Sequence, residues 1–379
     1  MHDLWTGEET VRIGFVANDF LLDGNRLRPG GCSYYRCMLP MNTLKGHRVA
    51  FGPPAFTSEH GFGVRIAKEQ AQFGFDVIVM KMLMDRWIPK YMQIAQELGQ
   101  KIIVDVDDHY DGLHEANRAY ETTDPSKNKI TNREHYRAVI QQADLLTVST
   151  PFLEEYYRPL VSDVRMVRNG INPNQFQPRK HRSMKPVLGW AGAMDWRSND
   201  AETARPWLGE FLNEHDLLFH HAGHMEDSKA FCDAAGVDID RMILSPMRPL
   251  HRYHEMLDFD IGLVLLSEID FNRAKSTIKG LEYAASNIPF VAQGLPEYEL
   301  LSHQGVGRVA YTPEGWKAQL TDLLDYKTRK REAATQRNLV LKDYSINARA
   351  HEWVDIYSMF RDAKAIVPNV KIEYVHAGG

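Results

Sequence analysis

The chain has 379 residues, of which 44% are apolar and 25% charged, and its formal net charge at pH 7 is −5. It is too long for one ordinary core and suits two α/β domains, and its composition excludes wholesale disorder. The acidic balance argues against a generally basic surface that would bind duplex nucleic acid.

Cysteines and apolar runs indicate the compartment. Cys32, Cys37 and Cys232 are odd in number and lack CxxC spacing, which favours reduced thiols over disulfides or a zinc site. Charged residues precede any long apolar run near the N-terminus, and the most apolar stretch, 261–266, is too short to span a bilayer. We therefore expect a cytoplasmic protein with no signal peptide and no membrane span.

Short apolar runs alternate with amphipathic stretches through the first half of the chain. Apolar residues recur at helical spacing over 85–98, and a second helix is expected at 132–143. Strands that are apolar throughout and separated by helices indicate a parallel sheet covered on both faces. The expected strands are 12–17, 49–51, 77–81, 101–104, 145–149 and 165–167.

The segment 172–185 interrupts this alternation, because it holds Pro173, Pro178 and several basic residues with little apolar content. We interpret it as an interdomain linker. The alternation then resumes, which predicts an α/β fold with two Rossmann-like domains, 1–171 and 186–342. The second set comprises strands at 187–191, 217–221, 242–244, 261–265, 290–292 and 308–311, helices at 201–213, 251–257, 278–285 and 313–325, and a helical tail at 327–360.

Ligands of such sheets bind beyond the carboxyl ends of the strands, so the loops there are the first candidates for a site. Gly30 and Gly31 close the loop 18–31 and open a helix, where backbone amides can approach an anion. The alternative is a plain strand-to-helix turn. Arg36, one turn into that helix, either reaches a phosphate or lies on a solvated face.

The loop after the strand at 101–104 is the most acidic point of the first half. In one interpretation Asp105 and Asp107 hold a divalent ion against a diphosphate, because hard cations prefer oxygen ligands. In another, Asp108 or His109 binds a substrate hydroxyl beside the reacting carbon. The third is a turn and capping cluster with no ligand.

Two further loops contribute candidates. Gly192 follows a strand and permits close backbone approach, and Arg197 in the same loop could pair with a diphosphate in bidentate fashion. Asn169 lies in a turn that ends the first domain, where it either contacts a ligand or serves the turn alone.

The segment 272–285 carries the sharpest set of candidates. Ser276 or Thr277 can cap a helix whose amides point outward, and Lys275 beside them makes an anion site suited to a diphosphate. Glu282 lies near the same face, where its carboxylate could accept hydrogen bonds from ribose hydroxyls. The alternative is a surface helix with a weak Lys279–Glu282 ion pair.

The 168–172 turn, the 189–197 loop and the 275–291 segment together resemble the retaining GT-B glycosyltransferases, the large family-four type in particular. The resemblance implies that the two domains face each other across a cleft. It also implies that a C-terminal helix within 343–379 crosses back to the first domain.

The same resemblance implies roles for particular residues. It places Glu282 on the nucleotide ribose, Lys275 and Ser276 near the sugar and phosphate, and Arg197 on the diphosphate. Gly30, Gly31 and the 107–109 loop match positions that approach the sugar and acceptor. The glutamate that contacts the donor sugar in the family is replaced here by Ala274.

The implied reaction moves a sugar from a nucleoside diphosphate sugar to an unknown acceptor, with retention and without a metal or cofactor. His109 and Asp108 would bind sugar hydroxyls, while Arg197 and Lys275 would neutralise charge on the departing diphosphate. The acceptor would meet first-domain loops at 21–29 and 114–128. The binding candidates are Gly30, Gly31, Asn169, Gly192, Ser276, Thr277 and Glu282.

Three rival hypotheses remain at this point. A metal-dependent transferase would use Asp105 and Asp107. A nucleotide-sugar epimerase of the same architecture would need no acceptor. A non-catalytic nucleotide- or sugar-binding protein would fit the replacement at Ala274.

Overall fold

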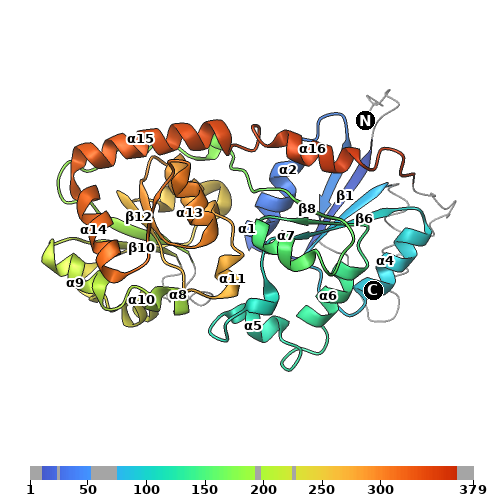
Figure 1. Cartoon of the computed structure of the whole chain (residues 1–379), viewed down its shortest axis with the longest axis horizontal. Coiled ribbons are helices and arrows are strands. Elements are labelled where there is room, and N and C mark those ends of the chain that lie inside the picture. Colours follow the sequence, from blue (N-terminus) through green and yellow to red (C-terminus); the bar gives the residue numbers. More distant parts are fainter. Residues whose placement is uncertain (1–10, 24–25, 53–74, 193–197, 224–227, 365–379) are drawn as a thin grey trace, which may run out of the picture.

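The computed structural model shows two lobes side by side, each built around a parallel sheet (Figure 1). It describes residues 11–23, 26–52, 75–192, 198–223 and 228–364. The first lobe contains the N-terminal half of the chain and the second the C-terminal half. The prediction of two Rossmann-like domains is therefore confirmed.

The first sheet has six strands in the order β4-β1-β5-β6-β7-β8, all pairing in parallel. Alternate residues of these strands pack in opposite directions, as the pleat requires. Side chains on one face of the sheet share a hydrophobic core with Tyr35 and Trp353, and those on the other face share one with Ile88 and Tyr136. The strands are β1 (Arg12–Ala17), β4 (Arg48–Gly52), β5 (Val77–Lys81), β6 (Lys101–Val106), β7 (Leu145–Val148) and β8 (Val164–Met166).

The second sheet has the order β11-β10-β9-β12-β13-β14, again all parallel. In chain order this is the 3-2-1-4-5-6 arrangement of a Rossmann fold, whose ligands bind where the strand order reverses. The reversal falls between β9 and β12. The strands are β9 (Leu188–Ala191), β10 (Phe219–Gly223), β11 (Met242–Pro246), β12 (Ile261–Val264), β13 (Phe290–Gln293) and β14 (Arg308–Ala310).

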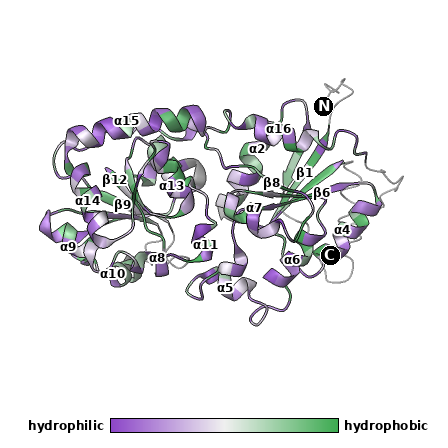
Figure 2. Ribbon diagram, viewed as in Figure 1, coloured by the Kyte–Doolittle hydropathy of each residue, from purple (hydrophilic) through white to green (hydrophobic). Residues whose placement is uncertain are grey.

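Helices cover both sheets, and Figure 2 shows hydrophobic residues concentrated on the strands while outer helices carry hydrophilic ones. Among the described residues, no helix is long and apolar enough to cross a membrane. The helices of the first lobe are α1 (Gly31–Ser33), the π-helical η1 (Tyr34–Met38), α2 (Leu39–Met41), α4 (Ile88–Glu97), α5 (Arg118–Thr123), α6 (Arg133–Gln141) and α7 (Pro151–Tyr157). Those of the second lobe and tail are α8 (Ser198–Glu202), α9 (Trp207–Glu214), α10 (Ser228–Ala235), α11 (Asp270–Arg273), α12 (Ile278–Ala285), α13 (Pro296–His303), α14 (Pro313–Leu324), α15 (Tyr326–Asp343) and α16 (Ala350–Ser358).

The predicted strands are all present, close to their expected ends, but some other elements differ from expectation. The loop expected at 18–31 contains an antiparallel hairpin, β2 (Phe20–Asp23) and β3 (Arg26–Pro29). The helix expected at 201–213 is divided into α8 and α9 around Pro206, because proline interrupts helical hydrogen bonding. The stretch expected as a helix at 251–257 is the 3-10 helix Leu250–Met256.

The basic segment after residue 172 packs on the second lobe. Arg182 donates to Asp260 at 2.9 Å, and Arg179 forms an ion pair with Asp258. The backbone amide of Arg179 also donates to the Ser286 carbonyl at 2.9 Å. The basic residues noted in this segment therefore pair with the carboxylates of Asp258 and Asp260, which precede strand β12.

The C-terminal helices span both lobes. Figure 1 shows α15 along the second lobe and α16 over the first. Tyr357 of α16 meets Phe15 of β1 edge-on, with ring centroids 5.8 Å apart, and Trp353 is completely buried. Helix α16 thus completes the first lobe's core.

Candidate functional site

Two adjoining cavities lie between the lobes, where loops at the carboxyl ends of strands from both sheets meet. The smaller, about 260 Å³, is lined by residues that include Gly31, Tyr35, Asn169, Ser276 and Glu282, and we call it the Glu282 cavity. The larger, about 500 Å³, includes Asn117 and Thr123, and we call it the Thr123 cavity. Gly31, Cys32, Asp108, Tyr253, Lys275 and Lys279 line both.

Direct contacts connect the two lobes at the Glu282 cavity. The Tyr35 hydroxyl donates to the Glu282 carboxylate, and Asn169 Nδ2 donates to Ser276 Oγ at 2.8 Å. Asn169 and Glu282, which are far apart in sequence and were proposed separately, therefore line one cavity.

Glu282 lies on α12 and is only 5% exposed. Burial and the charge of Glu282 raise the pKa of Tyr35 well above its ordinary value, so the phenol stays protonated and donates. The alternative of a surface Lys279–Glu282 pair does not fit this burial. The Lys279 ammonium donates to the Ala191 carbonyl and lies over the Trp190 ring.

Lys275 precedes α12 and contacts the first lobe. Its ammonium donates to Asp108 Oδ1 at 3.0 Å and lies 4.0 Å from the centroid of the Phe271 ring. Its side chain is 14% exposed and that of Asp108 is 19% exposed. A cation beside the start of a helix suits an anionic ligand. In this structure, Asp108 balances the charge of Lys275.

The expected cap of α12 is wrong. Thr277 occupies the N-cap position but makes no side-chain cap hydrogen bond, and Ser276 Oγ instead accepts from Asn169. Thr277 lines neither of the two cavities and borders a small pocket with Arg168 and Glu297. Ser276, in contrast, lines the Glu282 cavity.

The three glycine candidates differ in their surroundings. A Cβ on Gly30 would lie 1.8 Å from Asp19 Oδ1, so this glycine is required by close packing of the turn against Asp19. A Cβ on Gly31 would meet nothing within 4 Å, and Gly31 lines both cavities. Gly192 lines the Thr123 cavity, and a Cβ there would lie 2.9 Å from Trp190.

The metal hypothesis for Asp105 and Asp107 is contradicted at Asp105. That carboxylate is fully buried, accepts from Arg36 at 2.7 Å and from Thr147 Oγ1 at 2.8 Å, and lines neither cavity. Arg36 also lies over the Trp353 ring, with its Cζ 4.7 Å from the centroid. Arg36 therefore neither reaches the cleft nor lies on a solvated face, because it connects β6 with α16.

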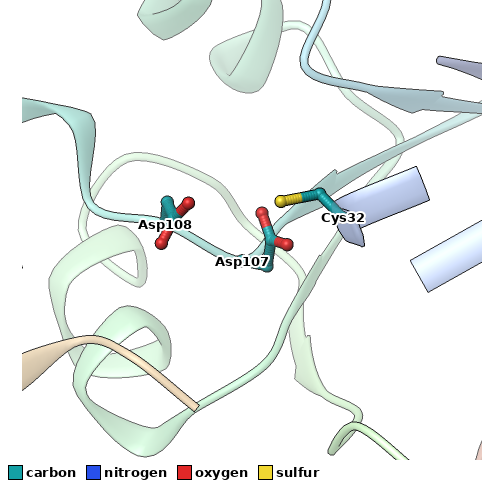
Figure 3. A group of neighbouring side chains, drawn as sticks. All are labelled: Cys32, Asp107 and Asp108. Atoms are coloured by element: carbon teal, nitrogen blue, oxygen red, sulfur yellow. The ribbon is translucent and has the colours of Figure 1, made fainter. Parts of the chain in front are cut away.

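A different carboxylate group lies in the cleft. Cys32, Asp107 and Asp108 present ligand atoms that all lie within 4.8 Å of one another (Figure 3). Asp107 forms an ion pair with Lys81, however, and Asp108 pairs with Lys275. Burial and the charge of Asp107 raise the pKa of Cys32 well above its ordinary value. A divalent ion would have to compete with both lysines and deprotonate this thiol.

His109 lies outside both cavities. Its imidazole is 4% exposed and meets the α7 rings of Tyr156 and Phe152 at centroid distances of 4.3 and 5.5 Å. Burial lowers the pKa of His109, although the charges of Asp111 and Asp270 oppose the shift. The geometry thus places His109 in packing against α7 rather than beside a sugar in the cleft. Arg197 lies outside the described residues.

Sequence reasoning missed several residues at the cleft. Lys81 ends the otherwise apolar strand β5, and its fully buried side chain forms an ion pair with Asp107 beside the cleft. Burial alone would lower the pKa of Lys81, but Asp107, together with the smaller effects of Tyr136, Cys32 and Asp105, outweighs burial and holds that pKa well above the ordinary value. A lysine at the carboxyl end of an apolar strand was the available signal. Tyr35 and Tyr253 carried no comparable signal.

Comparison with known proteins gives a fold but no close relative. No family model matches the chain, and no curated protein matches it. Similar solved structures include HepE from Anabaena in complex with UDP and glucose, at 10% identity and a TM-score of 0.62, covering 92% of this chain and 100% of HepE. A glycosyltransferase from Rickettsia africae has 11% identity and a TM-score of 0.64, covering 93% of this chain and 99% of that one.

TarM is also similar, with 11% identity and a TM-score of 0.56. The match covers 80% of this chain but 59% of TarM, so the chain spans little more than half of that protein. With two parallel sheets and a cleft between them, these likenesses define the fold as the GT-B fold of glycosyltransferases.

Proposed function

We propose that the protein is a glycosyltransferase that takes its sugar from a nucleoside diphosphate sugar bound in the Glu282 cavity. The observation that carries this proposal is the convergence of Glu282 and Lys275 from the second lobe with Gly31 and Asp108 from the first. A carboxylate suited to ribose hydroxyls and a cation suited to a diphosphate line one cavity. The structural neighbour solved with UDP and glucose supports the choice of ligand.

The donor is assigned to the second domain, 186–342, and the acceptor to the first, 1–171. Glu282 would accept hydrogen bonds from the ribose hydroxyls in place of the hydrogen bond that it accepts from the Tyr35 hydroxyl. Lys275 and the first amides of α12 would stabilise charge that develops on the leaving diphosphate, where a preorganised cation contributes most. Arg197 is proposed to assist at the diphosphate on the strength of the resemblance.

In this proposal the chemistry needs no metal, because Lys275 supplies positive charge at the phosphate. Asp108 would bind a hydroxyl of the donor sugar once Lys275 moves to the diphosphate. The leaving phosphate would take the acceptor proton, and retention follows from the resemblance. A cytoplasmic location fits Cys32, Cys37 and Cys232, which are all free thiols.

A thermal-shift panel of nucleoside diphosphates and their sugars, with and without EDTA, tests the donor site. A ligand at a hundred times its Kd adds about 2.7 kcal/mol of stability. We expect a shift with one base that survives EDTA and is lost in Glu282→Ala. Glu314→Ala, which changes an exposed glutamate of α14, is the matched control. A panel without any shift, or a shift unchanged in Glu282→Ala, rejects the assignment.

Ala274 favours one other candidate, a non-catalytic protein that binds nucleotide sugars. Its side chain is completely buried and its carbonyl accepts from Thr150 Oγ1 at 2.9 Å, so no carboxylate is available at this position. This candidate predicts nucleotide binding with neither transfer nor slow hydrolysis of the bound donor. Release of nucleoside diphosphate over hours, measured at saturating donor, separates the two.

A further inference from the structure

The Thr123 cavity has two walls of different chemistry. Its border with the Glu282 cavity carries the charged residues Asp108, Lys275 and Lys279. Asp19 lies on the same side. Its carboxylate accepts a hydrogen bond from the backbone amide of Ser33, and the preceding residue, Cys32, lines both cavities. The far wall is formed by Met82, Met84, Asn117, Thr122, Thr123 and Thr131, and none of the described residues that line it is charged.

Two of the threonine hydroxyls of the far wall, those of Thr122 and Thr123, present lone pairs rather than protons. Thr122 Oγ1 and Thr123 Oγ1 both donate to the Ala119 carbonyl, at 3.1 and 2.6 Å. A hydroxyl has one proton and two lone pairs, so each oxygen can still accept from a ligand but has no proton left to give. Such oxygens attract hydroxyl donors and repel a phosphate or carboxylate.

Apart from Asn18, Asn117 and Thr131, the remaining lining of the cavity is mostly apolar. Met82, Met84 and Tyr110 offer surface on which an apolar ring face can pack, and thioethers adapt readily to irregular shapes. A cavity of about 500 Å³ is within the range of small-molecule sites. Lone pairs beside apolar surface match a sugar, which combines hydroxyl donors with C–H faces.

We propose that the Thr123 cavity binds an uncharged carbohydrate as acceptor and discriminates against phosphorylated ones. That this carbohydrate is the acceptor rests on the proposed function, but its binding to the cavity can be tested without turnover. The hydroxyl that attacks would lie at the charged border, where the cavity joins the Glu282 cavity. The rest of the acceptor would lie against the far wall.

Binding of two matched sets of sugars to the full chain provides the test. The probes are methyl glycosides of glucose, galactose and mannose and the corresponding 6-phosphates, titrated by calorimetry with and without UDP. We expect at least one neutral glycoside to bind about ten-fold more tightly than its phosphate, a difference of about 1.4 kcal/mol. Tighter binding of the phosphates, or no binding of the neutral glycosides, overturns the inference.

Thr122→Lys locates the bound sugar. Thr122 is exposed on α5, so the substitution leaves the buried core intact, and it adds a cation to the far wall. We expect this variant to gain about ten-fold affinity for the 6-phosphate. Thr335→Lys is the matched control, because Thr335 is exposed on α15 and its hydroxyl likewise bonds a carbonyl of its own helix, that of Arg331. Equal affinities in both variants would place the sugar elsewhere and overturn the inference.

The outcomes separate this inference from the proposed function. Nucleotide binding without neutral glycoside binding rejects the acceptor class and leaves the donor site standing. Neutral glycoside binding that depends on residue 122, without binding of any nucleotide, rejects the transferase and retains a carbohydrate site. The melting temperature of each variant checks that it folds.

Discussion

The Tyr35 hydroxyl donates a hydrogen bond to the Glu282 carboxylate across the cleft between the two lobes. Tyr35 belongs to the helical turn η1 of the first lobe and Glu282 to α12 of the second. The residue assigned to the nucleotide ribose is thus held by a first-lobe group before any donor arrives. If the donor binds as proposed, it would exchange one hydrogen bond of Glu282 for another, and the interdomain contact and nucleotide affinity would then be interdependent.

Tyr35→Phe should bind nucleoside diphosphate more tightly than the wild type. The substitution removes a competitor of the ribose, and a hydrogen bond to a charged group is worth about 1.5–3 kcal/mol, so the Kd should fall about ten-fold. The unfolding free energy of the unliganded protein should fall at the same time. Calorimetric titration and chemical denaturation measure the two effects.

Tyr34→Phe is the control for this variant. Tyr34 donates to Gln175 at 2.7 Å and does not line the Glu282 cavity, so its loss should leave the nucleotide Kd unchanged. An unchanged Kd in Tyr35→Phe would show that Tyr35 keeps its bond to Glu282 in the complex.

Lys275→Met should remove most of the transferase activity while leaving the fold intact. If this ammonium stabilises the leaving diphosphate, its loss should lower kcat about 100-fold or more, as the loss of one preorganised electrostatic group typically does. Lys275→Arg should restore part of the rate. Lys317→Met, which removes a partly exposed lysine paired with Glu210 far from the cleft residues in sequence, should have no effect on kcat. A rise in KM alone would reduce Lys275 to a binding role.

Periodicity and the loops after strands predicted the fold well. Apolar runs such as 77–80 have no polar face, which a sheet covered on both sides accommodates. Helix α12 was expected with the bounds it has, Ile278–Ala285. The hairpin at Phe20–Asp23 was not expected, because its pairing depends on register rather than on a strong apolar pattern.

The candidate site was predictable only in part. Loop position identified Lys275, Ser276 and Glu282 as neighbours, since they follow one another along the chain. The orientation of a side chain is decided by tertiary partners that spacing does not reveal. Asp105 and Asp107 are two residues apart, yet Arg36 binds the first and Lys81 the second. For the same reason His109, although beside Asp108 in sequence, packs against α7.

Arg36→Met should destabilise the protein far more than the loss of a surface ion pair does. The substitution leaves the fully buried Asp105 carboxylate without its cation, and breaking such a pair costs about 3–5 kcal/mol. Arg137→Met, which removes an exposed guanidinium from Asp111, should cost at most about 1 kcal/mol. Urea denaturation measures both. Similar losses in the two variants would mean that the Arg36–Asp105 pair contributes little.

The stability of the protein should fall in mild acid partly through His109. Burial lowers the pKa of His109 below the value of 6.5 that applies to the unfolded chain. Between these two pKa values the unfolded state binds more protons, so the free energy of unfolding decreases as the pH falls below about 6.5. His109→Phe keeps an aromatic ring beside Tyr156 and removes the titrating group. Its unfolding free energy should therefore decline less steeply than that of the wild type between pH 7 and about 5, a range in which histidine titration contributes.

The buried His220, whose pKa is also lowered by burial, remains in both proteins and cancels in the comparison. Parallel pH profiles would show that the imidazole of His109 is protonated in the folded state as readily as in the unfolded one.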